Sequence, residues 1–174
     1  MEENVLSFQI VLDAESSDVG DVVLREALEF LQQCDADGDF DRLDWPAARG
    51  LPKTIHYMVK EQGADPSRRD EGGRTAMHVA AKAGHVDCVQ ALIEVGGDVM
   101  AKDTFGVTPL HLAAGEGKED MVSFLLEQGC PPDCICGKGS TPLLNACGAA
   151  HVRVARCLLM AGANPNRADM TGIY

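Results

Sequence analysis

Two histidines occupy the same place in two copies of one short motif. His78 stands in Thr-Ala-Met-His-Val-Ala-Ala, residues 75–81, and His111 stands in Thr-Pro-Leu-His-Leu-Ala-Ala, residues 108–114. Histidine titrates near neutral pH and is the side chain most often used as a general base, so the pair suggests catalysis. A third copy, residues 141–147, has Leu144 in that place. Because one copy dispenses with the base, we predict that both histidines are structural.

Seven cysteines form the second group of reactive side chains. Their number is odd and the N-terminus lacks the charged and apolar regions of a secretory signal, so reduced thiols are expected. Cys130, Cys134 and Cys136 lie close together in the sequence, as in a soft-metal site or a redox sensor. No Cys-x-x-Cys pair and no fourth ligand at ribbon-like spacing accompany them, so we predict no metal site. Cys147 is expected to pack as a small apolar side chain.

The acidic segment of residues 35–41 resembles a calcium-binding loop at first sight. If Asp35 were its first position, the required glycine would fall on Phe40 and the bidentate glutamate on Pro46, so the pattern fails. The sequence also contains no phosphate-binding glycine motif, no nucleophile motif and no convincing pair of catalytic carboxylates. We therefore expect a protein that is not an enzyme and has neither a cofactor nor a small-molecule substrate.

The negative charge of the chain is concentrated near its N-terminus. The 174 residues carry a net charge of −12, and 45% of them are hydrophobic, which suits one folded domain. Residues 1–44 hold 13 acidic and 2 basic side chains, whereas residues 45–174 hold 14 and 13. This balance disfavours nucleic acid as a partner, and no apolar run approaches the ~20 residues of a membrane helix. We expect the protein in the cytoplasm, with the nucleus as a second compartment.

The motif belongs to a repeat of 33 residues. Two further sets of markers keep this spacing: Gly73, Gly106, Gly139 and Gly172, and Gly63, Gly96, Gly129 and Gly162. Each module predicts a short helix capped by threonine and ended near Gly84 or Gly117, and then a second amphipathic helix. The turn-rich stretch between modules predicts a projecting loop or a short hairpin.

This pattern resembles the ankyrin repeat, which has the consensus D-x-x-G-x-T-P-L-H-L-A-A-x-x-G-H over its first half. The resemblance implies an all-α solenoid of helix-turn-helix modules with β-hairpin loops as projecting fingers, and a concave face formed by the fingers and first helices. It also implies that the motif histidine is a hydrogen-bonding core residue that ties neighbouring loops together.

The repeat register divides the chain into six segments. They are an acidic N-terminal cap segment over 1–37 with an amphipathic helix over 22–34, a degenerate repeat over 38–69 whose first helix is short, full repeats over 70–102, 103–135 and 136–168, and the start of a further repeat over 169–174. The first segment is expected to cover the apolar face of the first module.

The function expected from this resemblance is a non-catalytic protein-protein interaction module that serves as an adaptor, scaffold or inhibitor. The family binds other proteins through variable positions of the fingers and first helices. Here we assign partner binding to Arg68, Arg69, Glu71, Arg74, Lys82, Lys102, Thr104, Phe105, Val107, Glu116 and Lys138. Phe105, a large aromatic residue at a fingertip, is the expected anchor, unless it folds back onto the neighbouring finger. The alternative is a metal- or redox-responsive regulator that acts through the three clustered cysteines.

Overall fold

The computed structural model describes residues 42–167, which form eight helices. Their bounds are α3 Asp44–Arg49, α4 Pro52–Gln62, α5 Ala76–Ala83, α6 Val86–Glu94, α7 Pro109–Gly115, α8 Glu119–Glu127, α9 Pro142–Gly148 and α10 Val152–Met160. The first helix of the degenerate module, α3, has only 6 residues and is as short as predicted. The helix predicted over 22–34, the acidic segment 35–41 and the final segment 169–174 lie outside the described residues.

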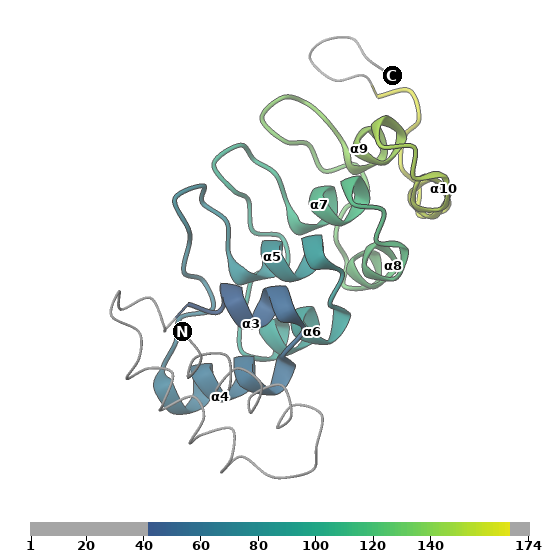
Figure 1. Ribbon diagram of the computed structural model, residues 1–174. Helices are drawn as coiled ribbons and strands as arrows, with labels where there is room; N and C mark the ends of the chain where they lie inside the picture. The colour runs from purple at the N-terminus through teal and green to yellow at the C-terminus, as the bar shows by residue number, and fades with distance from the viewer. Residues whose placement is uncertain (1–41, 168–174) are drawn as a thin grey trace, which may run out of the picture.

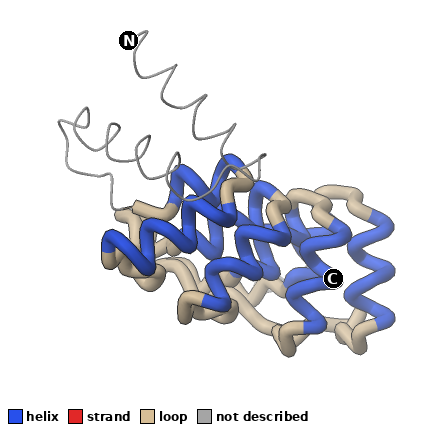
Figure 2. Tube along the Cα trace, turned by 90° about the horizontal axis from the view of Figure 1, so that it is seen from below, coloured by secondary structure: helices blue, strands red, loops and turns tan. Residues whose placement is uncertain are grey.

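The helices stack in two rows (Figure 1). Helices α3, α5, α7 and α9 pack side by side in one row, and α4, α6, α8 and α10 pack in the other. Figure 2, seen from below, shows the same stacked helices joined by loops. The core lies between the rows: the small side chains of Ala80 and Ala113 in the first row are fully buried, as are the larger Leu92 and Leu125 in the second. The predicted all-α solenoid is confirmed.

The threonines of the motif start the first helices. The side chain of Thr75 accepts a hydrogen bond from the backbone N–H of His78, and the His78 side chain accepts one from the backbone N–H of Thr75. Thr108 and His111 make the same two bonds. This is the reciprocal arrangement of a capping box, with histidine in the place usually held by Glu or Gln. Thr141 also accepts the N–H of Leu144, at 3.2 Å, but leucine has no acceptor to return.

Left-handed residues end the first helices as the glycine spacing predicts. Gly84 has φ 89° and Gly117 has φ 69°. The equivalent residue of the last module is Ala150, with φ 60°, a conformation that disfavours a side chain. A Cβ atom at Gly117 would lie 2.5 Å from Nδ1 of His151, whose Nε2 donates to the carbonyl of Gly115 at 3.0 Å.

Three fingers project from the first row of helices (Figure 1). We define finger 1 as residues 68–74, finger 2 as residues 101–107 and finger 3 as residues 134–140. Equivalent backbone bonds close the three fingers: Asp70 N donates to Arg74 O at 2.8 Å, Asp103 N to Val107 O at 2.9 Å, and Cys136 N to Ser140 O at 3.1 Å. No strand forms within residues 42–167, so each predicted hairpin is a tight turn.

Cys147 is exposed, contrary to the prediction that it packs, whereas the equivalent Ala81 and Ala114 are fully buried. The difference arises because a following first helix covers those alanines, and no such helix follows α9 in the described residues.

Among residues 42–167, the helices are all too short or too polar to cross a bilayer.

Candidate functional site

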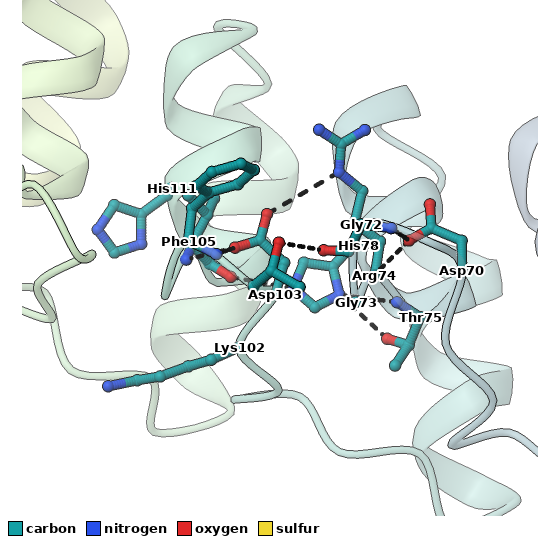
Figure 3. A network of polar contacts seen from close by, with 12 residues as sticks. Asp70, Gly72, Gly73, Arg74, Thr75, His78, Lys102, Asp103, Phe105 and His111 are labelled. Atoms are coloured by element: carbon teal, nitrogen blue, oxygen red, sulfur yellow. Dashed lines mark hydrogen bonds and ion pairs between the residues drawn. The ribbon is translucent and has the colours of Figure 1, made fainter.

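Two aspartates shape the first two fingers from inside. The Oδ1 atom of Asp70 accepts the N–H groups of Gly72 and Arg74, each at 2.8 Å. In finger 2, Oδ1 of Asp103 accepts the N–H groups of Phe105 and Val107, again at 2.8 Å. A carboxylate that receives two backbone N–H groups fixes the turn through charge-assisted bonds. Figure 3 shows both carboxylates directed at the backbone of their own fingers.

Neighbouring fingers are bonded to each other in register. The backbone N–H and the hydroxyl of Thr104 both donate to the carbonyl of Gly72, at 3.0 and 2.8 Å. The N–H of Gly137 donates to the carbonyl of Phe105 at 2.7 Å. A Cβ atom on Gly137 would lie 2.9 Å from the same carbonyl oxygen, so glycine permits this close approach. The three fingers therefore form one connected surface.

The motif histidines anchor the fingers to the helices. Nδ1 of His78 accepts the N–H of Thr75, so Nε2 carries the proton and donates to the carbonyl of Val107 at 3.1 Å. His111 repeats the arrangement with the carbonyl of Ser140 at 3.0 Å. Both side chains are fully buried, and burial lowers the pKa of each imidazole. They are neutral structural groups at pH 7, which confirms the predicted role.

Phe105 is displayed rather than folded back. Asp103 accepts the N–H of Phe105 and Gly137 donates to its carbonyl, so the backbone at the tip of finger 2 is fixed. The side chain is directed outward, and Phe105 is 65% exposed. Interfaces are enriched in aromatic residues and arginine, and a few such residues carry most of the binding energy. Ile135 in finger 3 is a second exposed apolar residue, at 42%. It is not among the residues that we assigned to partner binding from the sequence.

The other residues assigned to partner binding divide into three groups. Arg68, Glu71, Lys102 and Lys138 are exposed on the fingers, and Arg74 contacts Asp103 at 3.9 Å with its side chain 46% exposed. Arg69, Thr104 and Val107 instead hold the fingers together: Nη1 of Arg69 donates to the carbonyls of Gly73 and Lys102, at 2.7 and 2.6 Å. On the helices behind them, Lys82 pairs with Glu116 at 3.7 Å.

Burial raises the pKa of two of the three clustered thiols. Cys130 is buried with its thiol toward the carbonyl of Val99, and burial raises its pKa to about 11. The thiol of Cys134 lies 3.7 Å from Nδ1 of His111, and burial raises its pKa as well. Buried thiols of raised pKa carry little thiolate, the form that binds metals and reacts with oxidants. Within residues 42–167, no three His, Cys, Asp or Glu side chains are grouped as metal ligands.

The finger aspartates, like Ile135, were not identified from the sequence. Asp70 and Asp103 lie 33 residues apart, and each is followed by a glycine three residues later. Aspartate followed by glycine is a turn signature, so this signal was present in the sequence. Finger 3 departs from it, since Cys136 stands in the equivalent place.

Parts of the chain are similar to segments of much larger proteins. It is 32% identical to the potassium channel AKT1 of Arabidopsis thaliana over 80 residues, which are 44% of this chain and 9% of that protein. It is 34% identical to the uveal autoantigen with coiled-coil domains and ankyrin repeats of Bos taurus over 53 residues, 30% of this chain and 4% of that protein. It is 38% identical to cortactin-binding protein 2 of Ornithorhynchus anatinus over 52 residues, 30% of this chain and 3% of that protein. The matched segments make up less than a tenth of each of these proteins.

A family model of ankyrin repeats in three copies matches residues 43–134 and 95–169. Ankyrin repeats are general protein-protein interaction modules, and the family is typically non-enzymatic. The helix pairs, the threonine caps and the connected fingers agree with this match along the described residues. The chain belongs to the ankyrin repeat family.

Proposed function

We propose that this chain is a non-catalytic adaptor, scaffold or inhibitor whose partner protein docks on the three fingers and the adjoining first helices. The observation that carries the proposal is the display of Phe105 on fingers that are fixed to one another. Hydrogen bonds between residues about one module apart join finger 1 to finger 2 and finger 2 to finger 3. A surface that is ordered before binding loses little conformational entropy when a partner docks.

Affinity capture with paired variants tests this proposal. The finger variant combines Phe105→Ala with Arg74→Ala. The control combines Met160→Ala with Arg156→Ala on α10, a helix of the second row, which we call the outer helices. Both pairs remove one exposed apolar side chain and one exposed guanidinium group, so they change composition equally. We expect the finger variant alone to lose captured protein, with thermal unfolding unchanged in both. Equal capture by the finger variant and the unmodified chain would contradict the proposed face.

We further propose that the chain acts in the cytoplasm, with the nucleus as a second compartment. None of the six cysteines in the described residues forms a disulfide, which supports a reducing environment. Imaging of a fluorescent fusion tests this, and accumulation in a secretory compartment would contradict it.

A further inference from the structure

The aspartates on the finger side are engaged by donors of this chain. Oδ1 of Asp65 accepts the N–H and the hydroxyl of Ser67, at 2.8 and 2.7 Å, and these bonds lower the pKa of the carboxyl group. Asp70 and Asp103 are occupied by the turn amides of their own fingers, and the Asp103 side chain is only 2% exposed. One oxygen of each of these three carboxylates is therefore already occupied by two donors of this chain.

Several cations on the same side are exposed to solvent. Arg68, Lys102 and Lys138 are exposed on fingers 1, 2 and 3, respectively. The guanidinium group of Arg74 makes a long contact of 3.9 Å with Asp103 and remains half exposed. Glu71 is the exposed carboxylate within the fingers. At contact range, a partner on this surface therefore meets mostly positive charge.

An apolar group stands beside this charge. Figure 3 shows the Phe105 ring and the Arg74 guanidinium group on the same side of Asp103, while Lys102 extends in another direction. The hydrogen bond from Phe105 N to Asp103 and the ion pair of Arg74 with Asp103 bring the two residues to one carboxylate. The centre of the surface thus combines an exposed aromatic ring with an exposed guanidinium group.

We propose that this surface binds an acidic segment of the partner protein, with an apolar side chain on Phe105 and neighbouring carboxylates on Arg74 and the finger cations. The inference rests on the proposed function and specifies the chemistry of the partner. Guanidinium groups bind carboxylates through two parallel hydrogen bonds, and like charge excludes basic segments. Glu71 opposes such a partner, so its neutralisation strengthens binding.

The test uses the full chain and a phage-displayed library of random dodecapeptides. Enriched peptides are synthesised with a fluorescent label, and their affinity is measured by anisotropy. Arg74→Glu is compared with Arg156→Glu, which makes the same charge change on the outer helix α10, and Glu71→Gln is compared with Glu127→Gln on the outer helix α8. A single-stranded oligonucleotide of random sequence serves as a second polyanion.

We expect enriched peptides that combine Asp or Glu with Leu, Ile or Phe and that weaken as salt rises. Arg74→Glu and Phe105→Ala lower their affinity about tenfold or more, and Glu71→Gln raises it about twofold, while both outer-helix controls stay within about twofold of the unmodified chain. Neutral or basic peptides that still require Phe105 would overturn the acidic partner and leave the proposed function standing. The inference would also be overturned if no peptide were enriched, if both arginine variants had equal effects, or if the oligonucleotide bound as tightly as the peptides. The capture experiment decides the proposed function separately.

Discussion

The strongest structural prediction concerns Asp103, because one buried carboxylate holds the finger that displays Phe105. Replacing Asp103 by alanine removes the acceptor of two backbone N–H groups, those of Phe105 and Val107, each bonded at 2.8 Å. A hydrogen bond to a charged group contributes about 1.5–3 kcal/mol to folding, so two such bonds set an upper range of about 3–6 kcal/mol.

Two effects reduce the cost of Asp103→Ala. Removal of the carboxylate also removes the cost of burying its charge, and water reaches the freed Phe105 amide because that residue is exposed. The lost ion pair with Arg74 adds little, since its atoms are 3.9 Å apart and the arginine is half exposed. We therefore expect a loss of about 2–3 kcal/mol in the free energy of unfolding.

Asp70→Ala is the matched comparison, because Asp70 makes the same two bonds in finger 1. Asp70 is only half-buried, so water compensates more of its loss, and we expect about 1 kcal/mol. Asp103→Asn keeps an oxygen acceptor without the charge and should fall between Asp103→Ala and the unmodified chain. Urea unfolding followed by circular dichroism measures all three. Equal losses for both alanine variants, or no loss for Asp103→Ala, would refute the reasoning.

Three further predictions use urea unfolding as their measurement. Cys136→Asp should stabilise the chain by about 1 kcal/mol by supplying finger 3 with the missing turn acceptor, and a loss would show that the turn differs. Ala150→Gly should gain about 0.5–1 kcal/mol by relieving its left-handed backbone, whereas Gly117→Ala should lose at least about 1 kcal/mol; effects of the same sign would contradict this. Burial lowers the pKa of His78 and His111 in the folded chain, so the unfolded chain takes up protons at higher pH. The free energy of unfolding should therefore decrease as the pH falls below 6.5, by up to about 1.4 kcal/mol for each pKa unit by which folding lowers an imidazole. Proton NMR checks the assignment, and titration of both imidazoles at or above the ordinary pKa would refute it.

The helices and their ends were predictable because their signals are local. Threonine at the start of a helix and glycine at its end act within a few residues, and the repeat shows these signals several times. As predicted, Thr108 caps the start of α7, and Gly117 has the left-handed backbone that ends it. The role of the motif histidine also followed, through the family resemblance and the leucine in the third copy.

The roles of individual finger residues were less predictable because they depend on the neighbouring module. Arg69 reads as a surface cation in the sequence, but the carbonyl of Lys102 in the next finger engages its guanidinium group. The outward direction of Phe105 depends on the bond that its N–H donates to Asp103 and on the bond that its carbonyl accepts from Gly137. Cys147 fits an apolar helix position, yet its exposure depends on what packs against α9. Most of these contacts join residues of different modules, which no local pattern connects.

The third module shows how the array tolerates departures from its motif. Its finger lacks the aspartate and its first helix lacks the histidine, yet Asn145 supplies other bonds: Oδ1 accepts the hydroxyl of Ser140 at 2.8 Å, and Nδ2 donates to the carbonyl of His111 at 3.3 Å. These are bonds between neutral groups, which contribute less than the charged bonds made by Asp103. Finger 3 is therefore held more weakly than finger 2. The aromatic and guanidinium groups that we assign to partner binding lie on the two fingers that carboxylates fix, where preorganisation favours binding most.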